Sequence, residues 1–414
     1  MRLARTLPPA AAPMGWREVG AGLGAILEGQ PALRRFEAEL KSHFAAKHCF
    51  LVSSGKAALT LILRALKDLS PARDEVIIPA FTCYSVPSSV LRAGLKIGLC
   101  DLARDGLDLD AAGLSAALSE RALAVVPTHL YGIASDVSRV RQLIGTRGVA
   151  IVEDAAQAMD ETLDGRKLGT LGDVGFFSLG RGKAFSTVEG GVILTDCDDL
   201  ARALRSRLEE VADYGAGALL VLIAKAAALA TLTHPLLFWI PRALPFLRLG
   251  ETLFEKDFAI RRMSPFQAGL ARDWQQRLWR TRETRKANAM QWLAVLKDAG
   301  EPDSGLVRAP CPGLVRFPAR IRDGGRRSDL LRESERQGVG IAPSYPRAIN
   351  RLVELQGEIR SQHCPAAERC ARELVTLPTH GYVGERDIAA IRQLLAPVRT
   401  AAPDRGAPTS AKPL

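Results

Sequence analysis

The chain has 414 residues, more than one ordinary hydrophobic core holds, and this length predicts two domains or one large α/β domain with an appendage. Hydrophobic residues make up 47% and charged residues 24%, a balance typical of a globular protein and unlike that of a disordered one. The formal net charge of +11 favours an anionic partner. The basic residues are spread along the chain and form no nucleic-acid-binding motif, so we expect no nucleic-acid partner.

The cysteines and the first residues indicate the compartment. Seven cysteines are scattered along the chain without a CxxC pair, which argues against a disulfide framework. Cys364 and Cys370 lie near His363, but their spacing is not that of a zinc site, so we expect no bound metal. Free thiols are typical of a reducing cytosol. Residues 1–16 lack the apolar run of a secretory signal, so we expect a cytoplasmic protein.

The predicted elements begin with an amphipathic helix over residues 31–48, where apolar residues recur at helical spacing. A short strand over residues 49–52 follows, and a serine- and glycine-rich turn then opens a second helix that ends near residue 66. The first N–H groups of a helix have no partner within it, so this turn is a potential phosphate site. Such a turn alone more often only caps its helix.

Two further segments predict the type of sheet. Residues 74–102 read as a strand, a loop, a helix and a second strand, which form one βαβ unit. Residues 122–132 read as another strand and end in His129-Leu-Tyr-Gly. A histidine at a strand end can contact a substrate, although a lone histidine is more often structural. Strands that alternate with helices predict a mostly parallel sheet with helices on both faces.

Residues 151–195 carry the clearest indication of chemistry. A β-branched run over residues 148–152 predicts a buried strand with Asp154 at its carboxyl end, where open α/β sheets present ligand-binding groups. A second strand over residues 174–178 precedes a glycine-rich loop that carries Lys183. A lysine can form a Schiff base with an aldehyde, and a carboxylate can keep a pyridine nitrogen protonated. Either residue alone would more often be a cap or a surface charge.

Three spaced blocks carry a resemblance to a known family: EDAAQA (153–158), GDVGFFSLGRGK (172–183) and EGG (189–191). The chain resembles the DegT/StrS-type sugar aminotransferases, enzymes of fold type I that depend on pyridoxal 5'-phosphate (PLP). The resemblance extends, with gaps, from about residue 34 to about residue 394. It implies an α/β fold, with a large domain whose mostly parallel sheet is flanked by helices and a smaller C-terminal α+β domain. It also implies a homodimer with active sites at the subunit interface.

The resemblance implies a role for each residue that matches a family motif. Lys183 is the Schiff-base lysine and Asp154 the partner of the pyridine nitrogen. Gln157 lies near the ring hydroxyl, and Ser178 binds the cofactor phosphate. Once freed from the cofactor, Lys183 moves a proton as general base and then as general acid. Two further residues are weaker candidates for contacts with the substrate: His129 and Glu189.

The chain departs from the family pattern at three cofactor positions. The phosphate-binding loop reads SGKAAL where the family has SGTAAL, so Gly55 is kept and Lys56 replaces a threonine. Cys83 stands where the family has an aromatic residue that stacks on the pyridine ring, and Tyr84 follows one residue later. Tyr84 either takes over the stacking or lies in the core with a satisfied hydroxyl. Ile260 replaces an asparagine that contacts the phosphate of the neighbouring subunit.

Residues 214–249 form an apolar segment where the family has a polar one. Its only charged residues are Lys225, Arg242 and Arg248. Its longest uncharged run, residues 226–241, is shorter than the roughly 20 residues that cross a bilayer. Trp239, Phe238 and Phe246 together with the flanking arginines suit a peripheral element on the inner face of a membrane. The alternative is a helical hairpin buried against the body of the protein or a dimer partner.

The last third of the chain predicts the smaller domain. A strand, a helix and a second strand lie within residues 315–343, and residues 364–391 resemble the closing elements of the family. We therefore place a large PLP-binding domain at residues 1–260 and a small domain at residues 261–400. The Pro/Ala-rich residues 401–414 are expected to be a disordered tail.

The function expected from these patterns is transfer of an amino group from a donor, commonly glutamate, to a keto-sugar in glycan or polysaccharide biosynthesis. The family's usual acceptor is nucleotide-linked. One alternative is a PLP-dependent sugar dehydratase, but those relatives have histidine in place of Lys183. The other is a membrane-associated protein of the same fold that binds or regulates without turnover, which the departures at Lys56, Tyr84 and Ile260 leave open.

Overall fold

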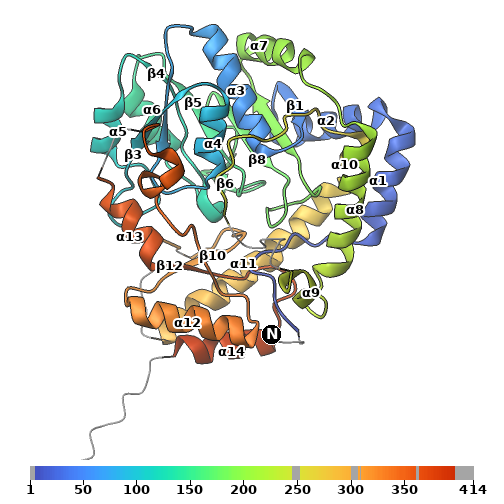
Figure 1. Cartoon of the computed structure of the whole chain (residues 1–414), viewed down its shortest axis with the longest axis vertical. Coiled ribbons are helices and arrows are strands. Elements are labelled where there is room, and N and C mark those ends of the chain that lie inside the picture. The colour runs from blue at the N-terminus through green and yellow to red at the C-terminus, as the bar shows by residue number, and fades with distance from the viewer. Residues whose placement is uncertain (1–4, 245–251, 300–305, 308, 360–362, 397–414) are drawn as a thin grey trace, which may run out of the picture.

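A seven-stranded sheet in the order β1-β9-β8-β5-β4-β2-β3 lies at the centre of the molecule (Figure 1). This computed structural model describes all residues except 1–4, 245–251, 300–305, 308, 360–362 and 397–414. Strand β9 runs antiparallel to β1 and β8, and the other neighbouring pairs run parallel, which confirms the mostly parallel sheet that we predicted. The strands are β1 (His48–Val52), β2 (Glu75–Pro79), β3 (Lys96–Cys100), β4 (Ala122–Val125), β5 (Ala150–Asp154), β8 (Val174–Ser178) and β9 (Gly191–Thr195). A small hairpin, β6 (Thr162–Leu163) and β7 (Arg166–Lys167), lies beside it.

Helices cover both faces of the sheet, so its strands are buried runs of apolar residues. Alternate residues of β9 show the two sides, because Ile193 packs into the core under α3 whereas Val192 and Leu194 pack toward α2. The helices around the sheet are α2 (Gln30–Phe44), α3 (Gly55–Leu69), α4 (Ser85–Arg92), α5 (Ala111–Ala117), α6 (Val137–Ile144) and α7 (Asp198–Glu209).

Helix α1 (Trp16–Glu28) was not predicted from the sequence. Its glycines lower its intrinsic helix propensity, so local sequence argues against it. The structure gives one of them, Gly22, and Gly269 of the neighbouring helix a packing role. A Cβ atom on Gly22 would lie 2.7 Å from the Phe266 ring, and one on Gly269 would lie 2.5 Å from the Ala21 carbonyl oxygen. The close approach of α1 to α10 (Pro265–Leu270) therefore stabilises α1 through tertiary contacts.

The C-terminal part forms a second unit around a three-stranded antiparallel sheet in the order β10-β12-β11. Its elements are β10 (Phe317–Arg320), α12 (Gly324–Gln337), β11 (Ala342–Pro343), α13 (Pro365–Glu373), β12 (Leu374–Leu377) and α14 (Glu385–Leu395). This α+β unit was also predicted. Helix α11 (Trp274–Asp298) joins the two units, because Trp274 packs into the core of the first and Trp292 into that of the second. The boundary at residue 260 stays a prediction.

The apolar segment 214–249 contains α8 (Ala216–Leu232) and the short α9 (Trp239–Arg242). Within the ranges that the structure describes, neither these nor any other helix has the length and apolar character needed to cross a bilayer. Helix α8 packs on α1 through Leu222 and Ala226. Phe246, Arg248 and the tail 401–414 lie outside the described residues.

The N-terminal segment is held against the second unit by a buried histidine. His380 Nε2 donates to the Pro8 carbonyl oxygen at 2.7 Å, and Nδ1 accepts the Tyr382 N–H at 3.3 Å. Both contacts use the neutral ring. Burial disfavours the charged form and lowers the pKa of His380 to about 4.

Stability is therefore expected to fall in acid. Between the unfolded pKa of about 6.5 and the folded pKa of about 4, the unfolded chain binds more protons at His380 than the folded chain does. His380 thus lowers the free energy of unfolding progressively as the pH falls through that window, by up to about 3 kcal/mol. Urea titrations from pH 7.5 to pH 4.5 should show a shallower loss in His380→Gln than in the wild type. The exposed His363→Gln should match the wild type, and equal slopes in all three proteins would contradict the assignment.

Candidate active site

Asp154 is the last residue of β5 and lies at the carboxyl end of the parallel part of the sheet. Its side chain is buried, with 5% of the residue exposed, and Oδ1 accepts the Ala156 N–H at 3.0 Å. In the part of the chain that the structure describes, Oδ2 accepts no hydrogen bond. Burial raises the pKa of Asp154, and the charge of Lys183 acts against that rise. The carboxylate thus has one oxygen held in place and one available to a ligand.

Glu153, which sequence reasoning missed, supports this strand end from behind. It accepts the N–H groups of Gly169, Leu171 and Gly172, and also the Nε2–H of His129 at 3.1 Å. Neighbouring residues of a strand point to opposite faces, so Glu153, the first acid of the EDAAQA block, could have been assigned to the face opposite that of Asp154.

His129 is fully buried in this structure. Besides its bond to Glu153, its Nδ1 accepts the Ser135 N–H at 2.9 Å, so both ring nitrogens are engaged by the protein. The ring thereby ties the turn after β4 to the end of β5. This arrangement matches the structural interpretation of a lone histidine, and the substrate contact stays a prediction.

Lys183 lies in the loop between β8 and β9 and is half-buried. The loop is closed at its base by hydrogen bonds from Leu179 N–H to the Gly190 carbonyl at 2.8 Å and from Thr187 N–H to the Leu179 carbonyl at 2.9 Å. Lys183 Nζ makes no hydrogen bond with any residue of the described ranges. Its charge is the largest influence that lowers the pKa of Asp154, so the two predicted residues lie within electrostatic reach of each other.

Arg285 of α11 holds the Lys183 loop and was also missed from the sequence. Its guanidinium donates to the carbonyl oxygens of Lys183 at 2.9 Å and Ala184 at 3.1 Å, and to that of Ala11 at 2.9 Å. The residue is 1% exposed, and burial lowers its pKa to about 10. One buried cation therefore joins the lysine loop, the N-terminal segment and α11.

Replacing Arg285 with lysine is expected to loosen that junction, because an ammonium cannot reproduce the planar fork that reaches three carbonyls. Loss of charge-assisted hydrogen bonds to buried carbonyls should lower the free energy of unfolding by about 2–4 kcal/mol, measured by urea titration. Arg280→Lys on the exposed side of the same helix is the matched control and should be neutral. Equal stability of the two variants would show that Arg285 is not a structural clamp.

The first turn of α3 and the end of β8 together form a cradle for a phosphate. The Ser54 side chain accepts the Ala57 N–H at 3.1 Å, which leaves the N–H groups of Gly55 and Lys56 without an acceptor inside the helix. A Cβ atom on Gly55 would lie 2.9 Å from Ser178 Cβ, so only glycine allows this approach. The Ser178 hydroxyl and the helix N-terminus therefore lie side by side, an arrangement that suits an anion.

The side chain of Lys56 is engaged elsewhere. Its ammonium forms an ion pair with Glu255 and lies 4.6 Å from the centre of the Phe258 ring. The backbone N–H of Lys56 remains at the helix N-terminus. Ile260, which follows in the same segment, packs half-buried against the core. The polar contact that the family makes through asparagine is thus absent at this position.

Gln157 is oriented by two tyrosines. Its Oε1 accepts the Tyr131 N–H at 3.1 Å, and its Nε2 donates to the Tyr345 hydroxyl at 3.0 Å. The Tyr345 ring lies 5.4 Å from that of Phe81, beside the position where the family has its stacking aromatic residue. Tyr345 comes from the second unit, so no local motif indicated it.

Tyr84 is buried in the core under α3. Its hydroxyl donates to the Arg347 carbonyl at 3.0 Å and accepts the Arg347 N–H at 2.9 Å. These contacts match the second interpretation, a core tyrosine with a satisfied hydroxyl. Cys83 is half-buried and accepts a hydrogen bond from the Ser85 hydroxyl at 3.0 Å. Stacking by Tyr84 stays a prediction.

Glu189 connects the lysine loop to the apolar segment. Its carboxylate accepts the Tyr214 hydroxyl at 2.6 Å and lies 3.5 Å from Lys225 Nζ of α8. Its backbone carbonyl accepts the Gln267 side-chain N–H at 2.6 Å. With these partners Glu189 supports the loop, and its predicted contact with substrate is untested.

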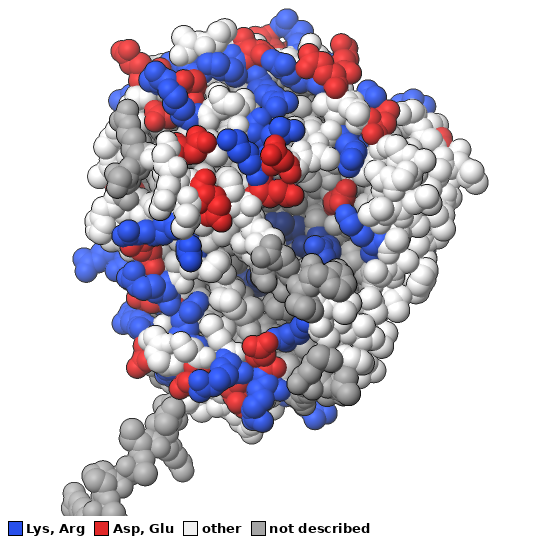
Figure 2. Space-filling view, in the orientation of Figure 1, with Lys and Arg blue, Asp and Glu red and all other residues white. Residues whose placement is uncertain are grey.

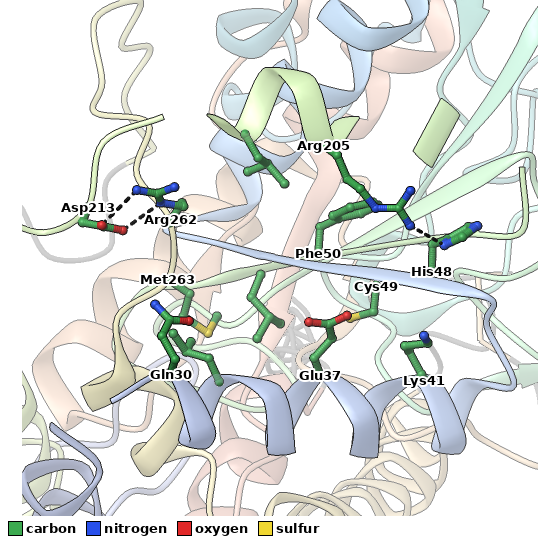
Figure 3. A pocket seen from close by; sticks show the side chains of 13 residues that line it. Gln30, Glu37, Lys41, His48, Cys49, Phe50, Arg205, Asp213, Arg262 and Met263 are labelled. Carbon is green, nitrogen blue, oxygen red and sulfur yellow. Dashed lines mark hydrogen bonds and ion pairs between the residues drawn. The ribbon is translucent and has the colours of Figure 1, made fainter. Parts of the chain in front are cut away.

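A separate groove of about 300 Å³ lies at the β1 edge of the sheet, between that strand and α2 (Figure 3). Arg262 and Asp213 are joined across one end of it by hydrogen bonds of 2.8 and 2.9 Å, and Arg205 donates to His48 at 3.0 Å near the other. None of the residues predicted for the cofactor lines this groove. Figure 2 shows a different hollow, at the centre of the face drawn, with Lys and Arg side chains inside it.

The residues at the carboxyl ends of β5 and β8 fit PLP. A glycine-lined helix N-terminus beside a serine hydroxyl suits its phosphate, and a buried carboxylate suits its ring nitrogen. The charge of Lys183, whose Nζ makes no hydrogen bond in the described part of the chain, acts on that carboxylate. The model of the DegT/DnrJ/EryC1/StrS aminotransferase family matches residues 22–215 and 256–395. The chain belongs to the DegT/DnrJ/EryC1/StrS aminotransferase family. The residues between its two matched ranges, 216–255, contain α8 and α9.

Named relatives agree with this membership. The chain is 34% identical, over 194 residues, to a UDP-N-acetyl-3-dehydro-alpha-D-glucosamine 3-aminotransferase of Acidithiobacillus ferrooxidans, covering 45% of this chain and 52% of that protein. It is 29% identical over 382 residues to an L-glutamine:2-deoxy-scyllo-inosose aminotransferase of Streptomyces lividus, covering 86% and 84%. The chain thus spans about half the length of the first of these relatives.

A solved structure with bound PLP has the same fold. The E. coli GDP-4-keto-6-deoxy-D-mannose-3-dehydratase with bound hydrated PLP superposes with a TM-score of 0.73 at 18% identity, over 95% of this chain and 100% of that one. At this identity the likeness shows the fold alone. The predicted fold class, a fold type I α/β sheet with a smaller α+β unit, is thereby confirmed.

Proposed function

We propose that this chain is a PLP-dependent aminotransferase that transfers an amino group, with glutamate as donor, to a nucleotide-linked keto-sugar in glycan or polysaccharide biosynthesis. The observation that carries the proposal is the cradle of Gly55 and Ser178 at the end of β8, together with the Lys183 charge that acts on the buried Asp154 carboxylate. The family membership and the sugar and cyclitol aminotransferases among its relatives support the same reaction.

Each residue of the site has a part in this proposal. Bound PLP supplies the electron sink that makes loss of a proton from the amino donor possible. Asp154 holds the ring nitrogen in its protonated form, and Gln157 orients the ring. Ser178 and the N–H groups of Gly55 and Lys56 bind the phosphate. Lys183 would take the proton from the donor's Cα as general base and would deliver it to the aldehyde carbon of the cofactor as general acid.

The presence of Lys183 favours transamination over the dehydratase alternative. The dehydratases of the family have histidine at this position, and a lysine can both hold the cofactor and transfer the proton. The second alternative is a binding or regulatory protein without turnover. Within the described residues, Lys183 Nζ makes no hydrogen bond and Asp154 uses only one oxygen, so both groups are available to a cofactor and its substrate, which favours the enzyme.

We also propose a homodimer, and a cytoplasmic enzyme that touches the inner face of a membrane through residues 214–249. The groove at the β1 edge lies beside Arg262, within the block that reaches the neighbouring subunit's cofactor in the family, and this supports the homodimer. The apolar sequence of α8 supports the membrane contact.

A direct test of the function uses purified protein with glutamate and a panel of keto-sugar nucleotides, with products identified by mass. We expect conversion of a keto group to an amino group, and bleaching of the visible absorption of the bound cofactor by glutamate alone. Loss of water from the sugar without gain of nitrogen would favour the dehydratase. Absence of any spectral response to glutamate or glutamine would favour the protein without turnover.

A further inference from the structure

The outer sides of α1 and α8 form an apolar face, here named the α1–α8 face and defined by Trp16, Leu23, Leu27, Leu220 and Val221. Among these, Leu27 is 92%, Leu220 66% and Trp16 61% exposed, although all three are large apolar side chains. The two helices pack side by side at one edge of the molecule, and that side is almost free of charge in Figure 2. An exposed apolar surface of this kind marks a contact site.

The helical period explains why the face exists. In α1, the exposed apolar residues Trp16, Leu23 and Leu27 recur on one side of the helix, and the buried Ala25 lies on the opposite side. Helix α8 is apolar on all sides, yet only Leu222 and Ala226 are fully buried. A helix that is apolar all round is normally covered on all sides.

Charge identifies the partner. From residue 216 to residue 244 the chain has two basic residues, Lys225 and Arg242, and no acidic one. Arg17, whose side chain is 85% exposed, lies next to Trp16 at the start of α1 and pairs with Asp273 at 3.4 Å. Lys225 and Arg242 pair with Glu189 and Glu335 in the same way. An apolar surface with an exposed tryptophan suits the headgroup region of a bilayer, and the net charge of +11 on the whole chain favours anionic headgroups. Lys225 pairs with Glu189, and the Thr231 hydroxyl, on the same side of α8 as Leu220, donates to the Ala227 carbonyl at 3.0 Å, so these polar groups of α8 are already engaged within the protein.

We propose that the α1–α8 face lies on an anionic lipid bilayer, with Leu27 and Leu220 inserted among the headgroups. This proposal rests on the membrane location proposed above. It assigns the contact to different residues. Phe238 and Trp239, which the sequence favoured, are half-buried against the protein, whereas α1, outside the apolar segment, supplies three of the five contact residues. The inner side of the same helices packs near Val188 of the lysine loop, so test substitutions must stay on the outer side.

Sedimentation of the full-length holoenzyme with vesicles tests the proposal. Vesicles of phosphatidylcholine with phosphatidylglycerol should carry the wild type down, and vesicles of phosphatidylcholine alone should do so far less, with the difference shrinking in high salt. The double variant Leu27→Glu/Leu220→Glu should lower partitioning at least about tenfold, since it removes two inserted side chains and adds two negative charges. The matched control is Leu69→Glu/Val353→Glu, which changes exposed apolar residues elsewhere and should bind as the wild type does.

The other outcomes overturn the proposal. If the wild type stays in solution with anionic vesicles, or the double variant sediments as fully as the control, the face does not contact lipid. If the wild type does not bind vesicles, and light scattering shows a smaller assembly for the double variant than for the wild type and the control, the face joins two copies of this chain. Transamination of a soluble nucleotide-linked acceptor is measured on the same proteins. If the protein binds vesicles but does not transaminate that acceptor, the proposed reaction is wrong, whereas the bilayer contact is still supported.

Discussion

Lys183→Ala is expected to abolish transamination, lowering turnover by about 10⁴-fold or more, because the variant loses both the amine that holds the cofactor and the base that moves the proton. The fold should survive. Nζ makes no hydrogen bond in the described part of the chain, and the Lys183 carbonyl, which Arg285 holds, is unaffected by the substitution.

The measurement combines turnover with the visible absorption of the lysine-bound cofactor, which should disappear while the far-ultraviolet circular dichroism stays unchanged. Arg181→Ala, at an exposed position of the same loop, is the matched control and should keep the absorption band. Wild-type turnover in Lys183→Ala would mean that another group performs the chemistry, and the central assignment would be wrong.

Asp154→Asn should slow the reaction while leaving the cofactor attached. Asparagine has the same shape, and its oxygen can still accept the Ala156 N–H, so the strand end should be preserved. The amide cannot stabilise a protonated ring nitrogen as the carboxylate does. Loss of such a preorganised charge costs on the order of 3 kcal/mol or more in transition-state stabilisation, which is about 10²-fold or more in rate.

The decisive comparison is between rate and spectrum. Asp154→Asn should keep the visible band, because Lys183 is intact. Its turnover rate at saturating donor should be lower than that of the wild type. Asp164→Asn, an exposed carboxylate in the hairpin after β5, serves as the control for a change of one charge. A near-normal rate in Asp154→Asn would assign the ring nitrogen to a different partner.

The sequence by itself determined the parts of this protein that depend on short stretches of chain. The alternation of strands and helices is enough to predict a mostly parallel sheet, since each element is defined by its own periodicity. Asp154, Ser178 and Lys183 belong to spaced motifs at strand ends, and parallel neighbours bring those ends to the same edge. The family could therefore be recognised without coordinates.

Only the tertiary structure decided how distant segments meet. Arg285 joins carbonyls at positions 11, 183 and 184, and Tyr345 reaches Gln157 across nearly half the chain, contacts that no local pattern encodes. Helix α1 forms against its own propensity because Gly22 permits close packing on α10. For α8, an even distribution of apolar residues leaves its outward side undefined in the sequence. Packing against α1 selects that side, and so determines which leucines face out of the molecule.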